Sequence, residues 1–79
     1  MVVVDHREME DLRQRLGLSV PELWLGYVAL GGSLTVDGVE GYLAGTAEIG
    51  HQDYDILAVA LNEALIDAGL NGTVPYAED

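Results

Sequence analysis

The sequence predicts an all-α protein, a compact four-helix domain whose central pair of helices resembles a helix-turn-helix. Apolar residues recur with a helical period in four segments, and start and stop signals separate these segments. The length of 79 residues suits one small domain with short connections. We therefore expect a single domain over 1–79, with helices at about 6–16, 20–30, 35–43 and 51–68 and an extended C-terminal tail at 71–79.

The first helix is predicted from one apolar stripe and one stop signal. Met9, Leu12 and Leu16 recur at i, i+3 and i+7, which places them on one face of a helix over 6–16. Gly17 follows and can adopt the left-handed conformation that ends many helices.

The second helix has the clearest start in the chain. Ser19 and Glu22 have the spacing of a capping box, and Pro21 stands in the first turn. The residues from Leu23 to Leu30 are then apolar almost all round the helix. Such a helix either lies centrally in the core or is covered by a partner.

The segment over 33–43 has two possible structures. As a helix it has Thr35 as N-cap, Asp37 in the first turn, and a buried stripe of Val36, Val39 and Leu43 with Tyr42 beside it. As a hairpin it turns at Asp37-Gly38. We favour the helix, because the neighbouring helices offer no sheet that a hairpin could join.

The fourth helix, over 51–68, contains the longest periodic run. Asp53 and Asp55 belong to its start, where acidic residues are favoured, and Gly69 ends it. Its apolar face consists of Tyr54, Leu57, Ala58, Leu61, Leu65 and Ala68, and Ile56, Val59 and Ile66 widen that face. After it, we expect Val74-Pro75-Tyr76 to be extended and to pack back on the helices.

The charge is strongly unbalanced and excludes two classes of partner. Three arginines and no lysine stand against fourteen acidic residues, for a net charge of −11. Residues 16–79 hold ten of the acids and no Lys or Arg. Because phosphates are contacted mainly by Lys and Arg, we expect neither nucleic-acid binding nor docking on an anionic membrane.

The location of the protein follows from what the sequence lacks. It contains no cysteine, and its first residues have no apolar stretch of signal-peptide length. No apolar run approaches the length of a membrane span. We therefore expect a cytoplasmic protein without disulfides.

Catalytic and metal-binding motifs are not recognisable. His6, His51, Ser19 and Ser33 are the conventional groups for nucleophilic catalysis, and no known motif joins them. His51-Gln52-Asp53-Tyr54-Asp55 gathers potential metal ligands, but it lacks the pattern of a calcium loop. We expect no enzyme activity, no cofactor and no metal.

Leu30-Gly31-Gly32-Ser33-Leu34 resembles the modification site of acyl and peptidyl carrier proteins. These are acidic four-helix domains that carry phosphopantetheine on a serine opening a helix, in a Gly-x-Asp-Ser-Leu context. The resemblance implies that Ser33 would be the modified residue. Gly32 stands where that family has aspartate.

Several longer strings are similar to small acidic all-helical proteins of high-GC Gram-positive bacteria, most of them uncharacterised. This resemblance implies a helix over 35–43 and assigns no activity. The strings include Glu22-Leu23-Trp24, Val39-Glu40-Gly41-Tyr42-Leu43 and Asp55-Ile56-Leu57-Ala58-Val59-Ala60-Leu61-Asn62-Glu63.

The function we predict is a non-enzymatic interaction or regulatory module whose acidic surface binds a basic partner protein. Trp24, Leu25 and Tyr27 are candidate anchors where helix 20–30 is exposed, although Trp24 and Tyr27 also suit the core. The candidate charges are Asp37, Glu40, Asp53 and Asp55, with Glu48, Glu63 and Asp67 as further ones. A homodimer through helix 20–30 is a further expectation. The alternatives are the carrier protein and a DNA mimic that inhibits a nucleic-acid-binding protein.

Overall fold

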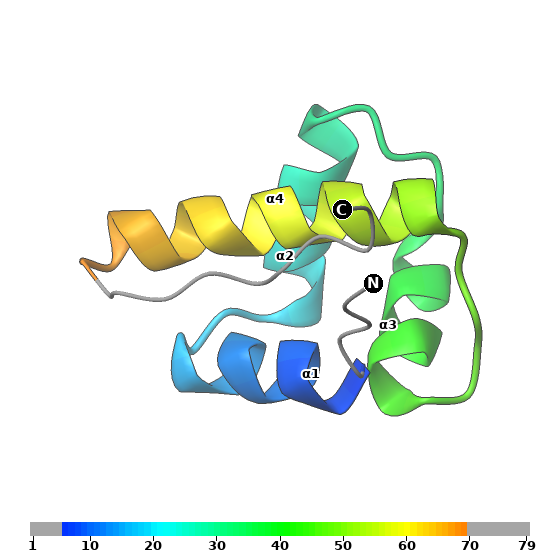
Figure 1. Cartoon of the computed structure of the whole chain (residues 1–79), viewed down its shortest axis with the longest axis horizontal. Helices are drawn as coiled ribbons and strands as arrows, with labels where there is room; N and C mark the ends of the chain where they lie inside the picture. The colour runs from blue at the N-terminus through cyan, green and yellow to red at the C-terminus, as the bar shows by residue number, and fades with distance from the viewer. Residues whose placement is uncertain (1–5, 70–79) are drawn as a thin grey trace.

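The computed structural model describes residues 6–69, which form the four predicted helices (Figure 1). They are α1 (His6–Arg15), α2 (Val20–Ala29), α3 (Val36–Ala44) and α4 (His51–Asp67). Every predicted helix boundary lies within one residue of the observed one, and the all-α four-helix domain is confirmed. The predicted tail at 71–79, which includes Val74-Pro75-Tyr76, lies outside the described residues.

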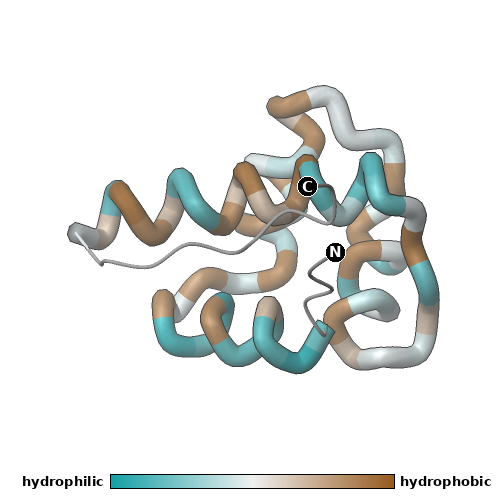
Figure 2. Tube along the Cα trace, in the orientation of Figure 1, coloured by the Kyte–Doolittle hydropathy of each residue, from teal (hydrophilic) through white to brown (hydrophobic). Residues whose placement is uncertain are grey.

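The helices pack around one core. Helix α2 contacts both α3 and α4, and α1 packs on α3. In Figure 1, α4 crosses α2 and its C-terminal end projects beyond it. Figure 2 shows hydrophobic residues recurring along α4, as the sequence period requires. The apolar residues buried between the helices are Met9, Leu23, Tyr27, Val39, Leu43, Tyr54, Leu57, Ala58, Ala60, Leu61 and Leu65.

Two helices begin at the predicted caps. Glu22 N donates to Ser19 Oγ at 3.2 Å, and Ser19 N donates to Glu22 Oε1 at 2.9 Å, which completes the capping box. This bond from the Ser19 backbone is the main reason that the pKa of Glu22 is lowered. At α3, Gly38 N donates to Thr35 Oγ1 at 3.1 Å. Residues 36–44 are thus helical, and the hairpin alternative is wrong.

Hydrogen bonds of Arg13 fix the end of α1, and the helical period of the sequence does not reveal them. Gly17 has φ +67°, and Leu18 N donates to Arg13 O at 3.1 Å. The Arg13 guanidinium makes two 2.7 Å bonds to the Glu10 carboxylate, and its Nη1 donates to Leu18 O at 2.6 Å. One arginine therefore neutralises an acid and also ties down the connection to α2.

The last turn of α4 departs from the prediction. Ala68 is exposed, and the Ile66 side chain is 70% exposed, although both were expected on or beside the buried face. The helical period continues to the end of α4, but this end projects beyond the helix that α4 crosses (Figure 1). Asn62, by contrast, is buried among the apolar residues.

Helix α2 is central on one side and uncovered on the other. Leu23 and Tyr27 are buried, whereas Leu25 is 61% exposed. Val28 and Leu30 are also exposed. The apolar composition of this helix therefore serves the core only in part.

Candidate functional site

Tyr27, a predicted anchor, belongs entirely to the interior. Its ring is fully buried, and its phenol donates to Asp53 Oδ1 at 2.7 Å. The phenol oxygen also accepts from the backbone N–H groups of Ser33 at 3.0 Å and Leu34 at 2.8 Å. Because no part of this side chain is accessible, Tyr27 cannot anchor a partner in this conformation. Of the two alternatives that the sequence left open for Tyr27, partner anchor and core residue, the structure shows the core residue.

The Tyr27 phenol links three parts of the fold. It joins α2 to the connection before α3 and to Asp53 in the first turn of α4. Burial raises the pKa of Tyr27, and the Asp53 carboxylate raises it further, while the Leu34 N–H bond opposes this. The phenol therefore stays neutral at physiological pH and can donate its proton to Asp53. Asp53 has a structural partner inside the molecule and is only half exposed.

Trp24 and Leu25 occupy different environments on α2. Trp24 Nε1 donates to Leu34 O at 2.9 Å, and the half-buried ring packs against the core. Leu25 is on the surface and is the most exposed large apolar residue of α2. Of the three predicted anchors, Leu25 alone presents most of its side chain to solvent. A homodimer contact through α2 stays a prediction, and it would cover this residue.

The predicted charges do not gather into one site. Asp37 and Glu40 are exposed on α3, whereas Asp55 is half-buried on α4. Within residues 6–69, no group of three His or acidic residues is placed to hold a metal ion. Also within this range, no helix combines the length and apolarity needed to cross a bilayer.

Ser33, the predicted carrier position, is exposed but does not open a helix. It lies in the connection between α2 and α3, two residues before the N-cap Thr35. Its backbone N–H is held by the Tyr27 phenol. In the carrier proteins that it resembles, the serine stands at the helix start, so the local geometry here differs.

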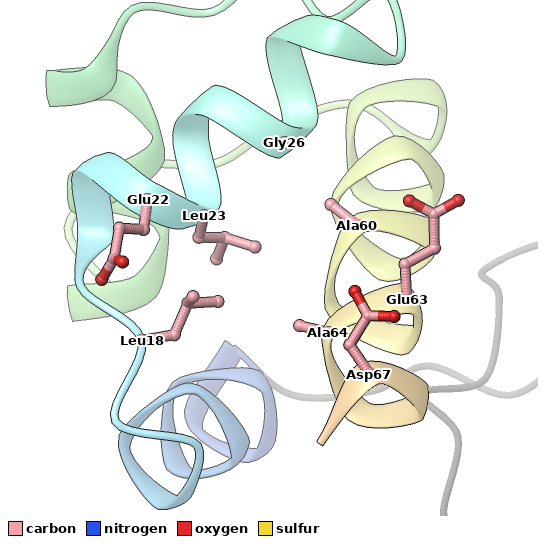
Figure 3. Close-up of a pocket in the computed structure, with 8 residues that line it drawn as sticks. All are labelled: Leu18, Glu22, Leu23, Gly26, Ala60, Glu63, Ala64 and Asp67. Atoms are coloured by element: carbon pink, nitrogen blue, oxygen red, sulfur yellow. The ribbon is translucent and has the colours of Figure 1, made fainter. Parts of the chain in front are cut away.

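A groove between α2 and α4 is a concave feature of the described surface that could take a ligand (Figure 3). Its volume is about 200 Å³. The inner surface is apolar and is formed by Leu18, Leu23, Gly26, Ala60 and Ala64. Figure 3 shows the methyl groups of Ala60 and Ala64 on one side and the leucines opposite them.

Three carboxylates border this groove. Glu22 comes from α2, and Glu63 and Asp67 come from α4, where their i, i+4 spacing puts them on one face. Glu22 is engaged in the capping box. Glu63 and Asp67 are exposed, and no ion pair or hydrogen bond within residues 6–69 engages their side chains.

Positive charge near the groove is already compensated. Arg13 Nη1 donates to the carbonyl of Leu18, a groove residue, but the Nε and Nη2 of the same guanidinium bond to the Glu10 carboxylate. Arg15 pairs with Asp11 at 3.0 Å on α1. Residues 16–79 contain no Lys or Arg. The groove therefore presents a negative edge above an apolar surface.

Sequence reasoning named Glu63 and Asp67 only as general surface charges and did not find the groove. A signal was available, because Ala60, Glu63, Ala64 and Asp67 follow the i, i+3, i+4, i+7 spacing of one helix face. Small and acidic residues on that face indicate a shallow acidic strip. The helix opposite this strip, with Gly26 in it, becomes evident only from the tertiary structure.

No family model, curated protein or solved structure matches this chain. The similarity to small acidic helical proteins of high-GC Gram-positive bacteria stays a prediction. The groove and its charges are therefore the features that indicate a function.

Proposed function

We propose that this protein is a non-enzymatic interaction module that binds a basic partner protein in the cytoplasm. The observation that carries the proposal is the α2–α4 groove, in which an apolar inner surface is bordered by the carboxylates of Glu22, Glu63 and Asp67. Protein interfaces combine an apolar centre with a polar rim, and complementary charge selects and steers the partner.

The charge distribution supports a basic partner. Each of Arg13 and Arg15 faces an acid on its own helix, so little positive charge is left to offset the acids of α2, α3 and α4. An excess of one sign accelerates the approach of an oppositely charged protein and repels those of the same sign. The exposed Leu25 on α2 offers further apolar contact area on the surface.

Affinity capture with identification of the captured proteins tests this function. The full chain is immobilised, exposed to lysate of the source organism at low salt, and eluted with a salt gradient. We expect specifically retained proteins to carry basic segments and to elute as salt rises, because screening weakens the attraction. Retention of mainly acidic proteins, or elution that ignores salt, would overturn the proposal.

Two matched charge variants test whether the groove is responsible for the capture. Glu63→Gln with Asp67→Asn removes two charges at the groove, and Asp37→Asn with Glu40→Gln removes two charges on α3. We expect the first pair to reduce capture more than the second. Equal loss in both variants would contradict a role for the groove and leave only a general charge effect.

A further inference from the structure

We propose that the α2–α4 groove receives one long cationic side chain, lysine or arginine, from a basic segment of the partner protein. This inference rests on the proposed function and specifies which chemical group the partner contributes. Three properties of the groove support it, namely its size, its apolar inner surface and the placement of its carboxylates.

The groove is large enough for a single long side chain. The groove holds about 200 Å³. A single extended side chain can therefore enter it, while the backbone that carries that side chain remains outside.

The inner surface suits the methylene stem of Lys or Arg. Gly26 has no side chain, and a Cβ built on it would lie 3.6 Å from the Cβ of Ala60. The two helices thus approach closely at Gly26 and Ala60, and a methyl group on α2 there would fill part of the apolar inner surface of the groove. Long cationic side chains commonly bury their stems on apolar surface while the charged end stays at a polar edge.

The carboxylates suit the charged end of that side chain. Glu63 and Asp67 are exposed, and none of the described residues pairs with their side chains. They border the groove together with Glu22, yet these acids are not placed to hold a metal ion. An ammonium or guanidinium group on a flexible stem reaches such a dispersed set of acceptors, whereas a small metal ion needs a converging one.

The test is an NMR titration of the full ¹⁵N-labelled chain with short blocked peptides that differ at one residue. The residue is arginine, lysine, citrulline as the neutral analogue of arginine, or norleucine as an uncharged stem. We expect the arginine and lysine peptides to shift the backbone amides of Gly26, Ala60 and Ala64. The two neutral peptides are expected to leave these amides unchanged at the same concentrations.

Two variants locate the binding. Gly26→Ala narrows the groove without steric conflict, and we expect weaker binding in a chain that is still folded. Glu63→Gln with Asp67→Asn is expected to weaken binding by about five- to tenfold, as the loss of two exposed ion pairs implies. Asp37→Asn with Glu40→Gln is the control and should weaken binding about twofold or less.

Several outcomes would overturn the inference. The first is that the citrulline peptide binds as tightly as the arginine peptide. The second is that the amide shifts near Asp37 and Glu40 are as large as those in the groove. The third is that the Gly26→Ala variant binds the arginine and lysine peptides as tightly as the wild type does. If the peptides fail in this way while captured proteins remain basic and salt-sensitive, the inference is wrong and the proposed function stands. If capture also loses its preference for basic proteins, both fail.

Discussion

The phenol of Tyr27 donates a 2.7 Å hydrogen bond to Asp53 Oδ1 across 26 positions of the chain. The same oxygen accepts two backbone N–H groups from the connection that leads into α3. A fully buried side chain on α2 therefore fixes both the entrance to α3 and the start of α4. These contacts show that two predicted partner-binding residues have structural roles, since Tyr27 is buried and Asp53 is hydrogen-bonded to it.

Replacing Tyr27 with phenylalanine should destabilise the fold without changing its shape. The variant keeps the ring but leaves Ser33 N, Leu34 N and Asp53 without the phenol, and unpaired groups in partly buried places are costly. We expect the free energy of unfolding to fall by about 2 kcal/mol, measured by urea denaturation.

A double-mutant cycle separates the Tyr27–Asp53 bond from the rest of this effect. Combining Tyr27→Phe with Asp53→Ala should give a coupling of roughly 1 kcal/mol, because each change removes the same bond. Tyr27→Phe with Asp37→Ala is the control, since Asp37 also stands in the first turn of a helix. An equally large coupling in the control would show that the Asp53 bond has no special weight.

The two most buried tyrosines within residues 6–69, Tyr27 and Tyr54, lead us to expect a loss of stability in alkali. Burial raises the pKa of Tyr54 to about 12, and it also raises that of Tyr27. Above the ordinary value of 10.0, the unfolded chain releases these protons while the folded chain keeps them. The stabilising contribution is thus complete below pH 10.0 and is lost as the pH rises toward about 12.

Urea denaturation at a series of alkaline pH values measures this loss, and tyrosinate absorbance reports the ionisation itself. The free energy of unfolding should decline less above pH 10.0 in Tyr54→Phe than in the wild type, by about 1–2 kcal/mol in total. An unchanged decline in that variant would show that Tyr54 ionises as easily in the folded chain as in the unfolded one.

Two glycine-to-alanine changes should alter stability in opposite directions. A Cβ at Gly26, an exposed position inside α2, meets only the Ala60 methyl at an ordinary 3.6 Å, so the higher helix propensity of alanine should add about 1 kcal/mol. A Cβ at Gly32 would overlap the ring of Tyr27, which is buried and cannot turn away. We expect Gly32→Ala to cost roughly 1–3 kcal/mol.

Thermal unfolding followed by circular dichroism compares the two variants directly. Both substitutions restrict the unfolded chain in the same way, so any difference in sign arises in the folded state. Equal melting temperatures would contradict the close contact between Gly32 and Tyr27.

The helices could be predicted because the signals that define them are local. The Ser19–Glu22 capping box and the Thr35 cap are each formed within four consecutive residues, and both are observed as expected. What the sequence could not predict depends on which helices meet. Ile66 is predicted to widen the apolar face of α4 and is nevertheless exposed, because that end of α4 projects beyond α2 (Figure 1). The groove likewise arises only where Gly26 faces Ala60.

The Glu10–Arg13 pair predicts a contribution to stability that vanishes in acid. Its two 2.7 Å bonds hold the pKa of Glu10 below its ordinary value of 4.5. A lowered carboxyl pKa stabilises the fold above 4.5, and the contribution is lost as the pH falls through the lowered value. Glu10→Gln should therefore cost about 0.5–1 kcal/mol at neutral pH and nothing in strong acid.

The control for this pair is Asp11→Asn. Asp11 faces Arg15 at 3.0 Å, but the two side chains are 56% and 71% exposed, so solvent screens their attraction. We expect Asp11→Asn to lower the free energy of unfolding, measured by urea denaturation, by less at neutral pH than Glu10→Gln does, and to change it little in acid. If wild type and Glu10→Gln still differ by the same free energy of unfolding in strong acid, Glu10 stabilises the fold by packing and not by charge.

Added salt should stabilise this protein, which is the reverse of what a fold held by ion pairs would show. Residues 16–79 contain ten acids and no Lys or Arg, so repulsion among the acids of α2, α3 and α4 opposes the compact state. Salt screens this repulsion over a Debye length that falls from roughly 30 Å at 0.01 M to 3 Å at 1 M. We expect the melting temperature to rise with sodium chloride.

We expect the rise to be smaller in a variant that combines Asp37→Asn, Glu40→Gln, Glu63→Gln and Asp67→Asn, because less repulsion remains to be screened. A melting temperature that stays constant with salt, or the same rise in both chains, would show that the acids lie too far apart to destabilise the fold.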